Sequence, residues 1–510
     1  MDQNIRVRYA PSPTGPQHIG GIRTALYNYL FAKKHGGAFI LRIEDTDQTR
    51  YVEGAEEYIL ESVKWCGFQF DEGVNIGGKY GPYRQSERKH IYRQFVQQLL
   101  DQGKAYYAFD SPEELSEIRT ALEQKKKSFK YDSSTRLSLK NSLSMEASEV
   151  EDLLAKGEPY TVRLAVPADT NIAVDDLVRG KVVINSRELD DKVIFKSDGL
   201  PTYHLANVVD DYLMKITHVI RGEEWLPSAP FHVLLYDYLG WKDQMPAFAH
   251  LPLLLKPNGN GKLSKRDGDA MGFPVFPLQW TNPKTKEQSS RYREAGYLPE
   301  AFLNILAFLG WNPGTEQELF NLDELIASFS LERVVKSGAK FDPEKAKWFN
   351  QQYLVQKTGK EISQLMISLD KSLQNVQNLD KIGDLMKERV HFASEIMEKG
   401  SYFFEKPADF DQKVVKKKWK EDSVAVVKQL RSLFDAQVDF QATALEQVFK
   451  EYVEGEAIPF GLAMISLRLC LTGQGGGPNL FEIMDVLGKT ETIRRLDECP
   501  ALIDAIKASA

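Results

Sequence analysis

Two short motifs carry residues that could bind a polyphosphate. The first, His18-Ile-Gly-Gly21, follows a predicted strand over 5–9 and precedes a predicted helix over 22–34. Backbone N–H groups at a helix start bind anions, and glycine lets a ligand approach the backbone closely. An imidazole there can also donate a hydrogen bond to phosphate oxygens. This motif predicts the floor of a nucleotide site.

The second motif is Lys262-Leu-Ser-Lys-Arg266, in a predicted loop with glycines on both sides. Its cations could close over a polyphosphate and neutralise it, and the flanking glycines favour a loop that opens and closes. The motif therefore predicts a lid. Either motif alone is also typical of an ordinary surface loop, so the prediction depends on the pair, in this order and spacing.

The elements around the first motif alternate between strand and helix. Strand-like runs at 5–9 and 39–43 are followed by helical periodicity over 22–34 and 55–66. This βαβ pattern predicts a parallel sheet that binds ligands at the carboxyl ends of its strands. The pattern returns over 200–255, with a strand at 216–221 and a helix at 228–239.

Between these two α/β stretches the chain changes character. Residues 111–154 are charged and poor in aromatic side chains, and strand-like runs follow at 160–166, 181–184 and 192–196. This combination predicts an inserted α+β domain. Beyond residue 295 the chain is mostly helical, and its last 170 or so residues show helical periodicity with little strand signal.

Composition excludes several classes of protein. The 510 residues carry a net charge of −7, which argues against nonspecific coating of nucleic acid. No apolar run reaches the length of a membrane span, and the polar start of the chain does not resemble a signal peptide. The three cysteines are far apart and predict neither disulfides nor zinc. We expect a cytoplasmic protein.

Further motifs in the sequence resemble those of a known protein family. The sequence resembles the bacterial glutamyl-tRNA synthetases, within class I of the aminoacyl-tRNA synthetases, over nearly its whole length. One departure from the class is Gly21, where many members have a second histidine, although the glutamate branch commonly has glycine there. Beside the two signature motifs, the resemblance lies in Arg8-Tyr-Ala-Pro-Ser-Pro-Thr-Gly15, Arg42-Ile-Glu-Asp-Thr-Asp47, Gly81-Pro-Tyr-Arg-Gln-Ser-Glu-Arg88, residues 197–211 and Arg221-Gly-Glu-Glu-Trp225.

The resemblance implies a two-step reaction. ATP, with Mg²⁺, activates L-glutamate to glutamyl-adenylate and pyrophosphate, and glutamate is then transferred to the 3′-terminal adenosine of tRNA(Glu). It implies no protein metal site and no membrane contact. We expect a monomer, because no amphipathic dimer seam is evident.

The resemblance also assigns residues. It implies that Arg8 and Arg221 bind the side-chain carboxylate of glutamate through planar guanidinium groups, and that Glu44 binds its ammonium group. Further implied glutamate contacts are Ala10, Ser12, Tyr203, Asn207 and Trp225. The implied catalytic residues are His18, Lys262 and Lys265. The implied ATP contacts are these three with Gly20, Gly21, Glu224 and Ser264. The implied tRNA contacts are Arg50, Arg389 and Arg468.

The expected domains follow from both lines of argument. We expect a multidomain α/β enzyme with a Rossmann-like parallel-sheet catalytic domain and an inserted α+β domain for the acceptor end of tRNA. A helical stem-contact region and an all-α anticodon-binding domain follow. The expected ranges are 1–100 and 197–256 for the catalytic domain, 101–196 for the insert, 257–340 for the lid loop and stem-contact region, and 341–510 for the anticodon-binding domain.

Two stretches depart from the family pattern. Some relatives carry a Cys-x-Cys zinc site in the insert, but the matching stretch here is Tyr106-Tyr-Ala-Phe-Asp110, so we expect no structural zinc. The second departure is an extra segment, Gly272 to Ser290, before Tyr292-Arg-Glu-Ala-Gly-Tyr-Leu-Pro299. We expect it to form a surface loop near the lid.

Other functions remain open at this point. A non-discriminating enzyme would also charge tRNA(Gln) with glutamate. A nucleotidyltransferase acting on a small cofactor shares the fold but needs no helical C-terminal domain, and neither does the truncated paralogue that glutamylates a modified tRNA base. A non-catalytic RNA-binding module would not require His18, Lys262 and Lys265 to be intact.

Overall fold

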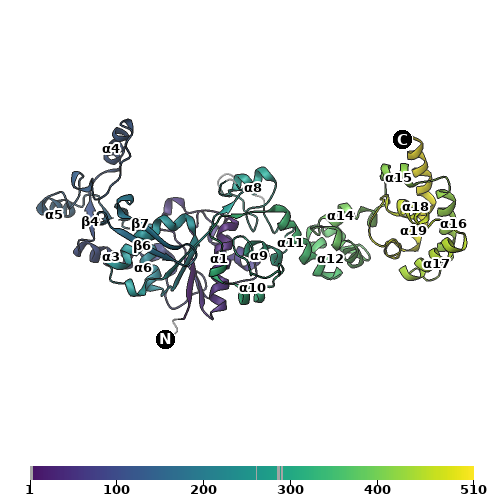
Figure 1. The fold of residues 1–510 in the computed structure, drawn as a ribbon, viewed down its shortest axis with the longest axis horizontal. Helices are drawn as coiled ribbons and strands as arrows, with labels where there is room; N and C mark the ends of the chain where they lie inside the picture. The colour runs from purple at the N-terminus through teal and green to yellow at the C-terminus, as the bar shows by residue number, and fades with distance from the viewer. Residues whose placement is uncertain (1–3, 260, 284–285, 287, 289–290, 510) are drawn as a thin grey trace. The chain divides into compact units, whose positions relative to one another are not determined.

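The computed structural model describes residues 4–259, 261–283, 286, 288 and 291–509 (Figure 1). The chain divides into two compact units. Unit 1 comprises Met1–Ala295 with Phe302–Pro343, and unit 2 comprises Gly296–Ala301 with Glu344–Ala510.

Unit 1 is built on a sheet whose seven described strands have the order β3-β2-β1-β9-β10-β6-β7. β1 (Arg6–Tyr9) lies inside this sheet, parallel to β2 (Ala38–Leu41) on one side and to β9 (His218–Gly222) on the other. Among the described strands of this sheet, β6 and β7 form the one antiparallel pair and the other pairs are parallel, so the predicted parallel-sheet core is confirmed. The other strands of this sheet are β3 (Glu72–Gly73), β10 (Ala247–Leu251), β6 (Asn171–Asp176) and β7 (Gly180–Asn185).

Helix α1 (Ile19–Lys34) connects β1 to β2 and packs on both strands. Its apolar side chains Ile22, Leu26 and Leu30 are fully buried, as the helical periodicity predicts. The helix begins three residues before the predicted start because the His18 side chain caps it by accepting a hydrogen bond from the Gly20 N–H. The other helices of the α/β core are α2 (Ala55–Trp65), α3 (Lys89–Asp101), α6 (Tyr203–Leu213), α7 (Ala229–Tyr238) and α10 (Leu322–Ser328).

The predicted insert, 101–196, contributes to two sheets. β4 (Ala105–Ala108), β5 (Thr161–Leu164) and β8 (Val193–Phe195) form a separate antiparallel sheet, while α4 (Pro112–Gln124) and α5 (Ala147–Lys156) lie beyond β4 (Figure 1). The β6–β7 hairpin instead joins the central sheet beside β10. The sequence predicts an inserted α+β domain but not this pairing, because strand alternation indicates a half-buried strand and not the sheet that the strand joins.

The predicted lid and stem-contact region, 257–340, lies in unit 1 apart from Gly296–Ala301. The lid motif leads into α8 (Lys265–Met271), and β11 (Leu254–Leu255) before it pairs with β12 (Ala339–Lys340). Helix α9 (Pro299–Ala307) follows the extra segment.

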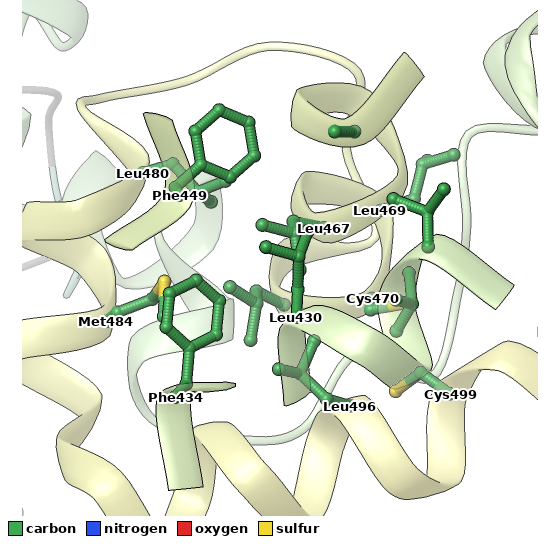
Figure 2. Close-up of a cluster of buried hydrophobic side chains, with 14 of the residues drawn as sticks. Leu430, Phe434, Phe449, Leu467, Leu469, Cys470, Leu480, Met484, Leu496 and Cys499 are labelled. Atoms are coloured by element: carbon green, nitrogen blue, oxygen red, sulfur yellow. The ribbon is translucent and has the colours of Figure 1, made fainter. Parts of the chain in front are cut away.

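Unit 2 is helical throughout its described residues, apart from turns and loops. Figure 2 shows its core, where Phe434, Phe449 and Leu467 from three different helices point toward one another. Within the described residues of the whole chain, no helix combines the length and apolar character needed to cross a membrane. The helices are α11 (Pro343–Gln356), α12 (Gly359–Leu369), α13 (Leu379–Met386), α14 (Glu395–Lys399), α15 (Gln412–Lys418), α16 (Ser423–Asp435), α17 (Ala442–Gly455), α18 (Phe460–Thr472) and α19 (Leu480–Ser509), which is interrupted at Gly488.

Candidate active site

A cavity of about 230 Å³ opens at the carboxyl ends of β1 and β9. The chain leaves β1 toward β2 on one side of the sheet and leaves β9 toward β10 on the other, so the cavity lies at a topological switch point, where open parallel sheets bind ligands. Eleven of the predicted site residues line it: Arg8, Ala10, Ser12, Gly20, Gly21, Glu44, Tyr203, Asn207, Arg221, Glu224 and Trp225. The residues that prediction missed are Tyr9, Pro11, Gln17, Thr24, Ile220 and Gly222.

One wall of the cavity is a buried network of paired charges. Arg8 Nε and Nη2 donate to the Asp211 carboxylate at 3.0 and 3.3 Å. Arg42 bridges Asp211 and Glu44, at 2.7 and 2.9 Å, and Asn207 Nδ2 donates to Glu44 Oε1 at 2.9 Å. Burial raises the pKa of Asp211, but the two guanidinium groups outweigh this effect and lower it overall. The network thus holds Glu44 in place with its charge balanced.

Arg221, on the other wall, is held by neutral groups. Its Nε donates to His250 Nε2 at 3.0 Å, Nη1 donates to the Tyr203 hydroxyl at 2.7 Å, and Nη2 donates to the Trp225 carbonyl at 3.4 Å. His232 Nδ1 lies 3.5 Å from Nη1. Burial lowers the pKa of both histidines, which keeps them uncharged. Arg221 is buried, with an exposed fraction of 5%, and yet no carboxylate among the described residues pairs with it. Its positive charge is therefore available to a ligand in the cavity.

Two aromatic rings form the mouth of the cavity. Tyr203 and Trp225 have ring centroids 4.4 Å apart, and Trp225 is exposed at 42%. Glu224, beside them, folds over Gly222 so closely that a Cβ there would lie 2.1 Å from a carboxylate oxygen. Any larger residue at 222 would therefore require the Glu224 carboxylate to move from this position.

His18 lies at the first turn of α1. Its Nδ1 accepts a hydrogen bond from the Gly20 N–H at 3.2 Å, which assigns the ring proton to Nε2. Nε2 is buried and has no partner among the described residues. Burial, with smaller effects of Lys262 and Arg23, lowers the pKa of His18 to about 4. The residue is therefore a neutral N–H donor near pH 7.

The two glycines of the first motif have different surroundings. A Cβ on Gly21 would lie 2.9 Å from both Gln17 Oε1 and the Tyr9 hydroxyl, whereas one on Gly20 would make ordinary contacts. A side chain at position 21 would therefore require Gln17 or Tyr9 to move, whereas one at position 20 would not.

The lid motif lies close to the mouth of the cavity. Lys262 Nζ is 3.3 Å from Glu224 Oε1, an exposed ion pair. Ser264 caps α8 in a reciprocal arrangement with Asp267, and Lys256 also pairs with Asp267 at 2.8 Å. Neither Lys262 nor Ser264 lines the cavity itself. Lys265 is the first residue of α8, and its side chain lies outside the described part of the structure.

The extra segment, 272–290, is the predicted surface loop only in its second part, where Thr281, Pro283 and Lys286 are exposed. Its first part is buried: Val275 is fully buried, and its carbonyl accepts a hydrogen bond from the Ile19 N–H at 2.9 Å. Phe276 meets the His18 ring edge to face, with centroids 6.1 Å apart. The Leu278 carbonyl accepts from the Tyr58 hydroxyl at 2.8 Å. We call residues 273–280 the strap, since they connect α8 to the start of α1. Residues 284–285, 287 and 289–290 lie outside the description.

The comparisons with known proteins agree with this geometry. Residues 4–348 match the catalytic domain of class I tRNA synthetases (E and Q), and residues 350–500 match an anticodon-binding domain. Glutamate–tRNA ligases of Bacteroides fragilis and Porphyromonas gingivalis W83 are 56% and 55% identical over 97% of this chain and 98% of their own. The chain belongs to the glutamyl-tRNA synthetase family. A crystal structure of the Elizabethkingia meningosepticum glutamate tRNA ligase, in complex with its amino acid, matches with a TM-score of 0.93 at 48% identity, over 99% of this chain and 100% of that one.

Two of the three arginines that family membership suggested for tRNA contact lie around one loop of unit 2. Arg389 Nη2 donates to the Gly477 carbonyl at 3.3 Å, and Arg468 Nη2 donates to the Pro478 carbonyl at 2.8 Å. Arg468 Nη1 is buried without a partner among the described residues. The third, Arg50, is exposed in unit 1 at the end of the turn after Asp47.

Over the described residues, no group of three or more His, Cys, Asp or Glu side chains could hold a metal ion. In the stretch aligned with the zinc site of some relatives, the Tyr106 hydroxyl donates to Asp191 at 2.6 Å and its ring is buried. This tyrosine is part of the core of the insert.

Proposed function

We propose that the chain ligates L-glutamate to tRNA(Glu), through glutamyl-adenylate. The observation that carries this proposal is the unpaired positive charge of Arg221, which lines the same small cavity as the carboxylate of Glu44. An amino acid with a side-chain carboxylate and an ammonium group is complementary to both. The cavity, at about 230 Å³, suits a metabolite of this size.

The pocket should discriminate by charge. Glutamate places its side-chain carboxylate on Arg221, with Arg8 beside it, and Tyr203 and Trp225 enclose the chain between the two ends. Ala10, Ser12 and Asn207 complete the contacts. Glutamine would leave Arg221 buried without a counter-ion, and such sites reject the wrong ligand strongly.

The first step is attack by the glutamate α-carboxylate oxygen on the α-phosphorus of ATP. The P–O bond to pyrophosphate breaks as the new P–O bond forms, so negative charge moves to the leaving group. His18 Nε2–H donates to a phosphate oxygen, since its other nitrogen is occupied by Gly20. ATP enters as its Mg²⁺ complex, and Gly20, Gly21 and Glu224 contact the nucleotide.

The lid residues stabilise the same charge. Lys262 leaves Glu224 for the phosphates when ATP binds, and Lys265 joins it as α8 moves with Ser264 at its start. Positioning and electrostatic stabilisation should account for most of the rate, as in phosphoryl transfer in general.

In the second step, a hydroxyl of the terminal adenosine of tRNA attacks the carbonyl carbon of glutamyl-adenylate, and AMP leaves. Arg50 contacts the tRNA in unit 1. Arg389 and Arg468 contact the anticodon loop in unit 2, because guanidinium groups bind unstacked bases and phosphates well.

The decisive experiment is aminoacylation with radiolabelled glutamate on purified tRNA(Glu) and tRNA(Gln), with unlabelled glutamine as competitor. We expect tRNA(Glu) to be charged and glutamine not to compete. Charging of both tRNAs would identify a non-discriminating enzyme. Absence of charging, with ATP turnover intact, would contradict the proposal in favour of a nucleotidyltransferase. An Arg389→Ala variant should weaken tRNA binding, while Arg494→Ala, an exposed arginine elsewhere in unit 2, serves as its control.

A further inference from the structure

Arg221 is oriented by a chain of buried hydrogen bonds that begins outside the cavity lining. Its Nε donates to His250 Nε2 at 3.0 Å, and His250 Nδ1 lies 2.6 Å from Asp176 Oδ2. The side chains of Asp176 and His250 are completely buried. We propose that Asp176 and His250 are positioning residues that hold Arg221 in the orientation that receives the side-chain carboxylate; this inference rests on the proposed function.

The hydrogen bonds leave His250 only one arrangement of its ring proton. A guanidinium group donates and never accepts, so Nε2 must present its lone pair to Arg221. The ring proton is then on Nδ1, where it is donated to the Asp176 carboxylate. A carboxylate that fixes the tautomer of a histidine in this way also fixes the direction of whatever the histidine holds.

Asp176 is itself fixed by the backbone. Oδ1 accepts from the N–H groups of Val178 and Arg179 at 3.0 and 2.8 Å, and Oδ2 accepts from the His250 N–H at 3.1 Å. These contacts exist because β6 pairs with β10, which brings the end of the hairpin beside the strand that carries His250. The carboxylate therefore cannot turn to offer its oxygens differently.

The other charges near His250 do not disturb this arrangement. Arg179 donates to the His250 carbonyl at 3.3 Å and is paired with Glu223. Arg221 is separated from Asp176 by the imidazole ring, so its charge is oriented without direct neutralisation. Arg8, which touches Asp211 directly, lacks this feature.

The test is Asp176→Asn. The backbone N–H groups of Val178 and Arg179 point at Oδ1, and the His250 N–H also reaches it at 3.3 Å, so the amide oxygen takes that place and the amide nitrogen takes the place of Oδ2. It donates to His250 Nδ1, which moves the ring proton to Nε2, opposite the Arg221 Nε–H. We expect the KM for glutamate to rise about tenfold or more, with kcat and the KM for ATP within about twofold of wild type.

Ring ¹⁵N NMR of the full-length protein reports the tautomer independently of activity. We expect an Nδ1–H signal for His250 in the wild type and an Nε2–H signal in Asp176→Asn, assigned by its absence in His250→Gln. His218→Gln, at the start of the same strand as Arg221, is the matched control and should change neither signal nor KM. A changed tautomer with an unchanged glutamate KM would overturn the inference, and so would an Nε2–H tautomer in the wild type.

A second pair of variants decides the matter if Asp176→Asn does not fold. His250→Gln keeps an acceptor near the Nε2 position, whereas His250→Leu removes it. We expect a near-normal glutamate KM in the first and an increase of about tenfold in the second. Equal KM values would overturn the inference. If the wild type fails to charge tRNA with glutamate, the proposed function is contradicted. The NMR measurement still decides separately whether Asp176 fixes the tautomer of His250.

Discussion

Two arginines in the cavity differ in what balances their charge. Arg8 shares Asp211 with Arg42, whereas Arg221 contacts only uncharged groups among the described residues. The binding free energy of the substrate's side-chain carboxylate should therefore depend mainly on Arg221. A buried charge whose counter-ion arrives with the ligand favours binding of the correct ligand over its neutral analogue.

We predict that Arg221→Gln raises the KM for glutamate by at least roughly 30-fold, since removal of one partner of a buried charge pair costs about 2–5 kcal/mol. Preference over glutamine should fall as well. Steady-state aminoacylation at saturating ATP measures both values. An unchanged KM would show that the side-chain carboxylate binds elsewhere.

The buried network of Arg8, Arg42, Glu44 and Asp211 should contribute to the free energy of unfolding. Asp211→Asn leaves Arg8 and Arg42 facing each other with one carboxylate fewer, and breaking a buried pair costs about 3–5 kcal/mol. We expect urea denaturation to show a loss of that size. The control is Asp237→Asn, which removes an exposed pair with Lys242 and should cost less than about 1 kcal/mol. Similar losses in both variants would contradict this account.

At the scale of elements, the strap connects the lid helix α8 to His18, the residue that we propose acts on the phosphates of ATP. A Cβ on Gly268 of α8 would lie 2.6 Å from Val275, so the lid helix packs tightly on the strap, and Phe276 contacts the His18 ring. We therefore expect a movement of α8 to displace the strap and, through it, the start of α1.

We predict that Phe276→Leu slows activation while leaving glutamate binding intact. Leucine preserves most of the buried volume, but the edge contact with His18, of the kind that contributes about 0.5–1.5 kcal/mol, is lost. The kcat of ATP–pyrophosphate exchange in the presence of tRNA should fall about two- to tenfold. The KM for glutamate should stay within about twofold. Met271→Ala, exposed at the end of α8, is the control; a loss equal to that of Phe276→Leu would argue against the strap.

Strands and helices that are marked by the periodicity of their own residues are predicted well. The expected strand at 5–9 and helix at 55–66 match β1 and α2 within a residue. The prolines of the strap, and its place in a segment that the family pattern lacks, predict a surface loop. The apolar side chains of Phe273, Val275 and Phe276 are instead buried. The membership of β6 in the central sheet depends on its partner β10, about 70 residues away, which strand alternation does not reveal.

The candidate site shows the same division. Motif residues such as Glu44 and Tyr203 were found because a family pattern marks them, and the structure brings them to one cavity. Asp176 and His250 carry no such mark, since each acts through another residue at long sequence separation. Residues that could do chemistry are therefore marked by type and motif, whereas the residues that orient them become evident only from the fold.

At the scale of the whole molecule, the two units differ in histidine content. The five histidines whose pKa is lowered, chiefly by burial, are all in unit 1, and only one of the eight in the chain, His391, is in unit 2. The five are His18 and His204, lowered to about 4, and His218, His232 and His250.

This asymmetry predicts that mild acid destabilises unit 1 first. Unfolded histidines take up protons below about pH 6.5, while folded His18 and His204 stay neutral toward pH 4. The unfolded state therefore binds more protons, and stability falls as the pH drops between these values, by about 1.4 kcal/mol per pH unit at most for each of these two residues. The lowered pKa values of His218, His232 and His250 act in the same direction. Hydrogen exchange at pH 7.5 and 5.5, followed by mass spectrometry, should show protection lost from β1 and β9 before α16 and α18. Parallel loss in both units would contradict the prediction.

The place of β1 in the sheet has a consequence for how the protein is made. β2 emerges from the ribosome soon after β1, but β9, the neighbour on its other side, ends only at Gly222. At about 5–20 residues per second, one edge of β1 stays open for roughly 10 to 40 seconds of translation. Asp211, the ion-pair partner of Arg8, is also synthesised only near the end of this interval. The nascent chain thus keeps a strand edge unpaired for that time, and we expect its first half to bind chaperones that shield strand edges.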